Sequence, residues 1–82
     1  MITIYGDKNC VWCDRAKKLC DELSLNYQYK LIRDPGIMEE LQEKVANVRT
    51  VPQIFWNDKY VGGYDQLASE IENTRNFGQD FI

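Results

Sequence analysis

The chain alternates between the two spacings of apolar residues that distinguish strands from helices. β-Branched and aromatic residues dominate 2–5 and again 27–32, which is typical of short strands. Apolar residues recur every three or four positions over 11–23, and every four positions over 37–46, with charged residues between them. These spacings predict two amphipathic helices, each following one of the strands.

The rest of the chain predicts a hairpin and a third helix. Two short apolar runs flank the polar pair Asn57-Asp58, a turn of hairpin length that lacks the glycine of the strongest hairpins. Leu67, Ala68 and Ile71 then follow a helical spacing. The predicted strands are 53–56 and 59–61, and the predicted helix follows Gly62-Gly63 and ends in the polar stretch 73–76.

This order of elements, β-α-β-α-β-β-α, predicts an α/β fold of the thioredoxin-like type. The first two strands are joined by a helix, so they should be parallel with a right-handed connection, whereas the hairpin adds antiparallel strands. We therefore expect a four-stranded mixed sheet with helices on both faces. The 82 residues contain no repeat and no Pro/Gly/Ser linker, so 1–82 should form a single domain.

Composition narrows the possible functions. The net charge is −3, from 10 Lys+Arg against 13 Asp+Glu, so the chain lacks the excess positive charge that is typical of proteins that bind nucleic acid. The apolar runs are far shorter than the roughly 20 residues of a membrane span, and the N-terminus lacks the pattern of a secretion signal. We therefore expect a cytoplasmic protein that binds neither nucleic acid nor membrane. Histidine is absent, which removes the commonest general base and metal ligand.

The candidate chemistry lies in the CxxC pair Cys10 and Cys13. Cys10 ends the loop after the first predicted strand, and Cys13 falls in the first turn of the following helix. Free amides and the dipole of this helix favour a thiolate at Cys10, and Lys8 adds positive charge beside it. Because the thiolate attacks, Cys10 is the expected nucleophile and Cys13 the resolving cysteine. Trp12, between them, either walls a groove beside the sulfurs or packs in the core.

The cysteines leave one metal alternative open. Structural zinc takes four ligands, commonly in two pairs, and a single CxxC without histidine does not supply them, so no metal is expected. An iron–sulfur cluster shared by a dimer through Cys10, with exogenous thiols completing the ligands, remains an alternative. Cys20 lies on the apolar stripe of the first helix and is expected to be a small buried hydrophobe rather than a third redox thiol.

Three motifs together resemble the glutaredoxin family. They are the segments CVWC at 10–13, RTVPQIF at 49–55 and VGGYDQL at 61–67, in an order that covers nearly the whole chain. The resemblance implies a thioredoxin-like fold and a glutathione-disulfide oxidoreductase, with Cys10 and Cys13 catalytic and glutathione as reductant and co-substrate. It also implies that the protein reduces disulfide-containing client proteins, ribonucleotide reductase among them. We expect the protein to be a monomer.

The resemblance further implies a glutathione site. The Val51-Pro52 peptide would be cis, and the backbone of Val51 would pair with the cysteinyl part of glutathione. Tyr64 and Asp65 would offer amides to the γ-glutamyl end, whose ammonium the Asp65 carboxylate would take. Lys8 and Arg49 would hold the glycyl carboxylate. The glutathione-binding residues implied in this way are Lys8, Trp12, Arg49, Val51, Pro52, Gly63, Tyr64 and Asp65.

Two positions depart from the family pattern. Val11 stands where proline usually follows the first cysteine, and it restores an N–H. One more amide near Cys10 should favour the thiolate and make the couple more oxidising. Trp12 stands where tyrosine is commoner, so a role that needs the phenolic hydroxyl is lost.

Two other functions compete with this interpretation. One is a thioredoxin-like donor served by a protein reductase, and the other is a cluster carrier or scaffold without turnover. Lys8, Arg49 and Asp65 argue against the first, because such charges suit a small zwitterionic tripeptide better than a broad apolar docking face. A brown anaerobic preparation whose colour depends on Cys10 would favour the second.

Overall fold

The predicted order of elements is confirmed by the structure. The computed structural model describes the backbone of residues 1–79 and the side chains of residues 1–72. Its elements are β1 (Ile2–Gly6), α1 (Val11–Glu22), β2 (Tyr27–Leu31), α2 (Ile37–Lys44), β3 (Gln53–Trp56), β4 (Lys59–Gly62) and α3 (Tyr64–Gln79). Residues 80–82 lie outside the described residues.

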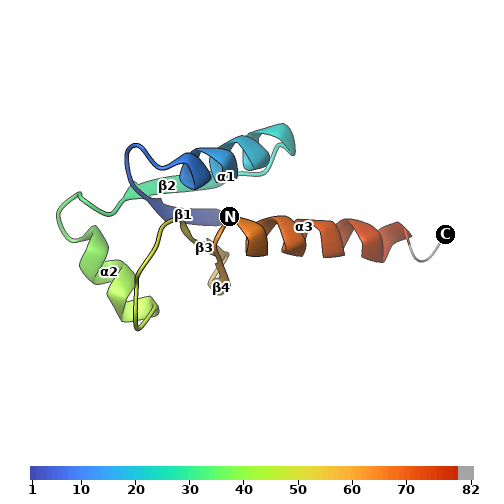
Figure 1. The fold of residues 1–82 in the computed structure, drawn as a ribbon. Coiled ribbons are helices and arrows are strands. Elements are labelled where there is room, and N and C mark those ends of the chain that lie inside the picture. The colour runs from blue at the N-terminus through green and yellow to red at the C-terminus, as the bar shows by residue number, and fades with distance from the viewer. Residues whose placement is uncertain (80–82) are drawn as a thin grey trace.

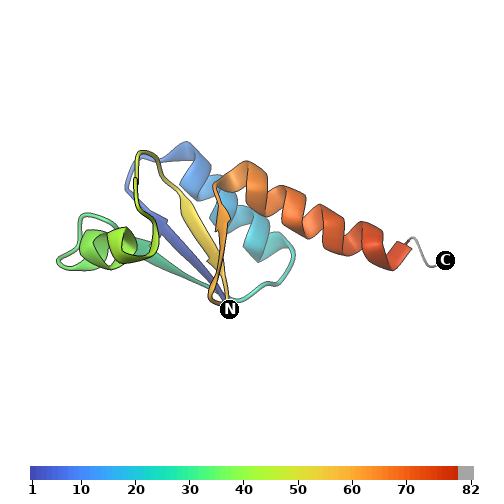
Figure 2. The ribbon, with the colours of Figure 1, turned by 90° about the horizontal axis from the view of Figure 1, so that it is seen from below.

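The strands form one mixed sheet of four strands in the order β2-β1-β3-β4. β1 pairs with β2 in parallel and with β3 antiparallel, and β3 and β4 form the predicted hairpin. Figures 1 and 2 show α1 and α3 together on one side of this sheet, with α2 set apart on the other. The thioredoxin-like layout with helices on both faces is therefore confirmed.

The larger part of the core lies between the sheet and the helices α1 and α3. Successive side chains of a strand point to opposite faces, so Ile2 and Ile4 of β1 share this face with Ile54 of β3. The helices add buried side chains to the same cluster: Ala16, Cys20, Leu67 and Ile71. The apolar stripe predicted for 11–23 is thus the surface by which α1 packs.

A smaller cluster holds α2 against the opposite face. Leu41 is fully buried against Tyr5 and Phe55. The Tyr5 hydroxyl donates to Glu40 at 2.5 Å, and Lys30 from β2 pairs with the same carboxylate at 2.7 Å. α2 ends at Lys44, before the predicted end at residue 46, because Val45 turns to an extended conformation (φ −129°, ψ 119°).

The predicted end of the third helix is wrong. The polar stretch 73–76 is helical, and α3 continues to Gln79. Asn and Thr are weak helix formers, but they keep the backbone N–H that proline lacks and do not by themselves end a helix. A polar stretch of this kind is equally compatible with an exposed helical turn.

The topology brings three chain segments to one edge of the sheet. β1 and β3 are antiparallel, and the pairing of Tyr5 with Gln53 places the end of β1 beside the start of β3. Ile54 pairs with Gly62, so the end of β4 lies at this edge as well. The loop 7–10, the residues before β3 and the start of α3 therefore converge there.

Candidate redox site

Cys10 is the N-cap of α1 and is joined to Cys13 by a disulfide. Its backbone is extended (φ −109°, ψ 105°), and its sulfur accepts a hydrogen bond from the Cys13 N–H at 3.2 Å. The sulfur thus takes the place of the oxygen that Ser or Asp normally supplies at an N-cap. It lies at the positive end of the helix dipole, which favours a thiolate when the disulfide is reduced.

The two sulfurs differ in their access to solvent. Cys13 is completely buried, whereas Cys10 is only partly covered. An attacking thiolate has to approach the sulfur it attacks, so an external thiol reaches Cys10 before Cys13. The asymmetry matches the predicted division of labour, in which Cys10 meets the substrate and Cys13 acts from within the protein.

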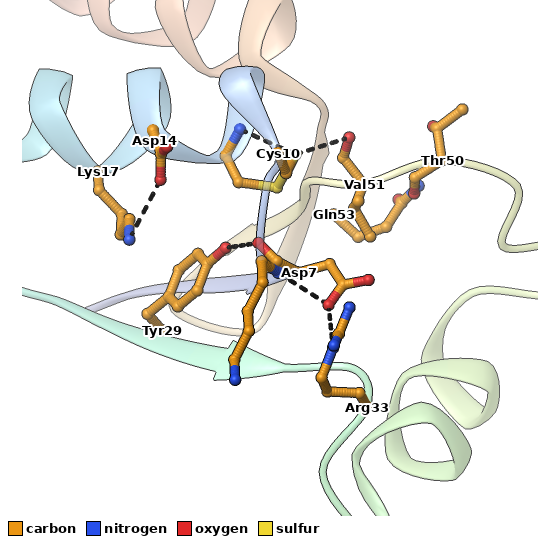
Figure 3. The surroundings of a disulfide bond; sticks show 11 residues. Asp7, Cys10, Asp14, Lys17, Tyr29, Arg33, Thr50, Val51 and Gln53 are labelled. Carbon is orange, nitrogen blue, oxygen red and sulfur yellow. Dashed lines mark hydrogen bonds and ion pairs between the residues drawn. A yellow bond between two sulfur atoms is a disulfide. The ribbon is translucent and has the colours of Figure 1, made fainter.

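The Val51-Pro52 peptide lies directly beside the disulfide and is cis, as the family resemblance implies. The carbonyl oxygen of Val51 is 3.7 Å from the Cys10 sulfur, and Figure 3 shows the two facing each other. Gln53, the first residue of β3, donates its side-chain amide to the carbonyl of Thr50 at 2.8 Å. This hydrogen bond ties down the segment that carries the cis peptide.

A groove of about 270 Å³ begins at this point. Its walls come from the start of α1, the residues before β3 and the start of α3, and they consist of Trp12, Thr50, Val51, Pro52, Gly63, Tyr64, Asp65 and Gln66. Trp12 is 48% exposed and its ring lies 5.5 Å from that of Tyr64, so it lies at the surface rather than in the core. Six of the eight residues proposed for glutathione from the sequence meet in this groove.

The two predicted cations lie outside the groove. Lys8 lines a separate hollow between the 7–10 loop and β2, together with Asp14 and Lys17. Arg49 lines an adjoining hollow that shares Thr50 and Val51 with the groove. Arg49 is therefore the nearer of the two to the groove wall.

Three further residues at or near the groove are not among those predicted from the sequence. Gln66 accepts from the Gly63 N–H at 2.9 Å, so it caps α3 as well as lining the groove. The sequence does contain a pattern that predicts this cap, because a Gln three positions after an N-cap residue is half of a capping box. Thr50 lies beside Val51 and carried no signal of its own. Arg15 stacks over the Trp12 ring at 4.6 Å, a contact that only the helix geometry reveals.

Cys20 takes no part in this arrangement. It is fully buried in the core cluster of α1 and α3, as expected for a small apolar residue. Burial, with a smaller contribution from Asp21, raises the pKa of its thiol to about 11. A thiol with this pKa is almost entirely protonated near neutral pH and is a poor nucleophile.

Among the side chains that the structure describes, those of residues 1–72, there is no group of three or more His, Cys, Asp or Glu placed to hold a metal ion. None of the helices described within 1–79 is both long enough and apolar enough to pass through a bilayer.

Comparisons with known proteins agree with the geometry of this site. The glutaredoxin family model matches residues 2–61, which contain the CxxC pair and the cis-proline. The chain belongs to the glutaredoxin family. It is 42% identical over 76 residues to Glutaredoxin 1 of Escherichia coli (strain K12), a match that covers 84% of this chain and 89% of that relative. The family predicted from the three motifs is thus confirmed.

Solved glutaredoxin structures have the same fold. The structure of reduced E. coli glutaredoxin matches with a TM-score of 0.79 and 39% identity, over 92% of this chain and 96% of that one. A buckwheat glutaredoxin solved as a complex with glutathione matches with a TM-score of 0.75 and 27% identity, over 89% of this chain and 69% of that one. As a glutaredoxin with its cysteine pair in place, the protein is a thiol–disulfide oxidoreductase.

Proposed function

We propose that this glutaredoxin depends on glutathione, with Cys10 as nucleophile and Cys13 as resolving cysteine. The observation that carries the proposal is the position of Cys10. The residue is partly exposed at the N-terminus of α1, and its sulfur lies 3.7 Å from the Val51 carbonyl oxygen at the groove wall. The Cys13 sulfur is buried behind it. Only one sulfur of the pair is therefore presented to a bound thiol.

The proposed reaction moves two electrons from the dithiol to the substrate. The Cys10 thiolate attacks a substrate disulfide, forms a mixed disulfide and releases one substrate thiolate, which takes up a proton. Cys13 then loses its proton and attacks the Cys10 sulfur, so that the second substrate thiol leaves and the Cys10–Cys13 disulfide forms. Two glutathione molecules restore the dithiol, and they leave as one glutathione disulfide after giving up two electrons and two protons.

The groove supports a small peptide as the reductant. Its volume of about 270 Å³ is close to the lower end of small-molecule sites, roughly 300 Å³. Asp65 is exposed in the first turn of α3, where the carboxylate is available for an ammonium group and the free amides for a carboxylate. We place the γ-glutamyl end there and the cysteinyl part along the backbone of Val51. The glutathione complex of the buckwheat relative supports the same class of ligand.

The glycyl carboxylate would lie toward the cations around Cys10. Arg49 borders the groove through Thr50 and Val51, so we assign it the direct contact. Lys8 lies in the neighbouring hollow and would contribute through its charge. Replacing Arg49 by Gln should therefore raise the KM for glutathione more than replacing Lys8 by Gln, which steady-state kinetics would measure.

Glutathione dependence is tested by changing the source of electrons. With glutathione, glutathione reductase, NADPH and a small disulfide substrate, the protein should reduce the substrate, and glutathione reductase should oxidise NADPH as it reduces the glutathione disulfide formed. Thioredoxin reductase without glutathione should give no turnover above background. Equal rates in the two systems would favour the thioredoxin-like donor instead.

The roles of the cysteines are tested by single substitutions. Cys10→Ser should abolish exchange with glutathione disulfide, while Cys13→Ser should still reduce glutathione mixed disulfides because that reaction needs one thiol. Cys20→Ala is the matched control, and it should keep the activity since Cys20 lies in the core. Full activity of Cys10→Ser together with loss in Cys13→Ser would reverse the assignment.

We also propose disulfide-containing proteins as clients, with ribonucleotide reductase among them, a cytoplasmic location and a monomeric state. The client is supported by the family resemblance alone. A cytoplasmic location fits a couple that is restored by reduced glutathione. Ribonucleotide reductase would be supported as a client if it forms deoxyribonucleotides with this protein present and glutathione as the only reductant. Sedimentation would test the monomeric state.

A further inference from the structure

Asp7 is the centre of a small group of hydrogen bonds at the start of the loop 7–10, which leads to Cys10 and is called the redox loop below. It follows β1 directly and precedes Cys10 by three positions. Its Oδ1 accepts from the Nε of Arg33 at 2.6 Å and from the N–H of Lys8 at 2.8 Å. Its backbone carbonyl accepts from the hydroxyl of Tyr29 at 2.9 Å. Figure 3 shows Asp7 between Tyr29 and Arg33, on the loop that leads to Cys10.

These contacts join the redox loop to the neighbouring strand. Tyr29 belongs to β2, and Arg33 to the turn that follows it. β1 and β2 are parallel and Gly6 pairs with Leu31, so Arg33 follows β2 at the same end of the sheet as Asp7, and the Tyr29 hydroxyl reaches Asp7 from the middle of β2. Gly6 allows this close packing, since a Cβ there would overlap the Tyr29 hydroxyl. The conformation of 7–10 is therefore fixed from the side of β2.

The charge of Asp7 is unfavourable for the proposed chemistry. A carboxylate near Cys10 disfavours a thiolate there and works against the helix dipole. The hydrogen bond from Arg33, with the amide of Lys8, lowers the pKa of Asp7, so its charge is present throughout the working range. The compensating charge therefore has to come from a neighbouring cation.

We propose that Arg33 is a positioning residue for the redox reaction, which holds the 7–10 loop through Asp7 and cancels the Asp7 charge that would oppose a Cys10 thiolate. The inference rests on the proposed role of Cys10 as nucleophile. Arg33 itself is half exposed and lies beyond Asp7 as seen from Cys10 (Figure 3). It acts through Asp7 rather than on the substrate.

Other cations around the loop do not replace Arg33. Lys8 also lies beside Asp7, but it contacts the Asp7 carboxylate through its backbone N–H, whereas Arg33 contacts it through the guanidinium. Lys17 of α1 is paired with Asp14 at 3.4 Å and lies over the Tyr29 ring at 4.2 Å. Arg15 stacks on Trp12. Charged side chains near Cys10 come from the loop, α1, the turn after β2, the segment before β3 and the start of α3. They are Asp7, Lys8, Asp14, Arg15, Lys17, Arg33, Asp34, Arg49 and Asp65.

The test measures how the reactivity of Cys10 depends on pH when the charges are changed. In a Cys13→Ser background, the rate of alkylation by iodoacetamide reports the fraction of Cys10 thiolate, which displaces iodide. Arg33→Gln should shift the midpoint of the rate profile to higher pH. Below that midpoint the rate should fall about threefold, the scale of a partly exposed charge interaction. Added salt should shrink the difference.

Two rescue variants separate charge from structure. Asp7→Asn combined with Arg33→Gln removes both charges, and the Asn oxygen still accepts from Lys8, so the midpoint should return toward that of the parent. Arg33→Lys keeps the positive charge, so its midpoint should also lie close to that of the parent. Lys59→Gln is the matched control, because Lys59 pairs with Glu70 at 3.6 Å and stands at the other end of the sheet.

The outcomes distinguish this inference from the proposed function. An unchanged profile in Arg33→Gln, or a double variant as slow as the single one, would overturn the inference while leaving Cys10 as nucleophile. Circular dichroism would show that each variant is folded. Tandem mass spectrometry of the tryptic peptide 9–15 identifies the alkylated side chain, and no pH-dependent reaction at Cys10 would overturn the proposed function itself.

Discussion

At the residue scale, three cysteines of one short helix region have different reactivity because they have different surroundings. Cys10 caps α1 and is partly exposed, Cys13 is buried behind it in the disulfide, and Cys20 is buried in the core. Only the first combines an accessible sulfur with the N-terminus of a helix. Exposure and the helix dipole, rather than cysteine chemistry alone, are the grounds on which we propose Cys10 as the nucleophile.

Cys20 should make the stability of the protein depend on alkaline pH. Burial raises the pKa of its thiol to about 11 in the folded state, above roughly 8.5 in the unfolded chain. Its contribution is therefore complete below the unfolded pKa and is lost as the pH rises through the folded pKa. Urea unfolding at several pH values would measure this for the wild type and for Cys20→Ala.

Cys20→Ala is the reference variant, because the two proteins share every other titratable side chain. Wild type should be more stable than Cys20→Ala by roughly 1 kcal/mol at pH 7, comparable to one buried methylene. The difference should shrink between pH 9 and 11 and not at lower pH. A difference that stays constant across this range would contradict the burial argument.

At the element scale, the start of α3 forms one wall of the groove and depends on its cap. Gln66 accepts from the Gly63 N–H, and Gly62 before it has φ +118°, a conformation that glycine adopts without strain. A Cβ at Gly62 would also press on the Gln66 side chain. The glycine pair and the glutamine therefore work together to set the direction in which α3 leaves the sheet.

Replacing Gln66 by Ala should lower the free energy of unfolding by about 1 kcal/mol, the usual size of a lost cap hydrogen bond. It should also raise the KM for glutathione, because the groove wall at Gly63 and Tyr64 loses its support. Gln66→Glu keeps the acceptor and should preserve stability. Chemical denaturation and steady-state kinetics measure the two effects, and equal loss of stability in both variants would argue against capping.

α2 contributes to stability through a core cluster that contains none of the residues of the groove. Leu41 is fully buried against Tyr5 and Phe55 on the face opposite α1. Leu41→Ala should cost about 2–5 kcal/mol in the free energy of unfolding. Where the variant is still folded, its rate of exchange with glutathione disulfide should equal that of the wild type. Loss of activity in a folded variant would show that α2 supports the redox loop.

At the scale of the whole molecule, the site exists because the antiparallel pairing of β1 with β3 and of β3 with β4 brings distant segments to one edge of the sheet. Cys10, Val51 and Tyr64 come from separate parts of the sequence, and each lies just outside a strand. The parallel neighbour β2 adds Tyr29 and Arg33 from the other side. The sheet thus positions both the groove and the support of the redox loop.

The order of elements and most of the groove were predictable because short-range patterns carry them. Apolar spacing predicted α1, and the motifs predicted Trp12, Val51 and Asp65 at the site. The contact of Arg33 with Asp7 was not predictable, since it depends on which strand pairs with β1 and on side-chain direction. The end of α3 was missed for a different reason, because polar residues end a helix only when another conformation competes.

The positions of Lys8 and Arg49 illustrate the same limit. Both are exposed cations close to the site in sequence, yet they line different hollows beside the groove. Long charged side chains are placed by the backbone that carries them and by the charges around them. Sequence motifs identified the cations, and the structure was needed to separate them.

The most direct test of the account is to find which sulfur glutathione attacks in the wild-type disulfide. The oxidised protein is mixed briefly with glutathione, free thiols are trapped by iodoacetamide, and the tryptic peptide 9–15 is fragmented by tandem mass spectrometry. Because Cys13 is buried and Cys10 is not, glutathione should be found on Cys10 and the alkyl group on Cys13. Glutathione on Cys13 with the alkyl group on Cys10 would contradict the account.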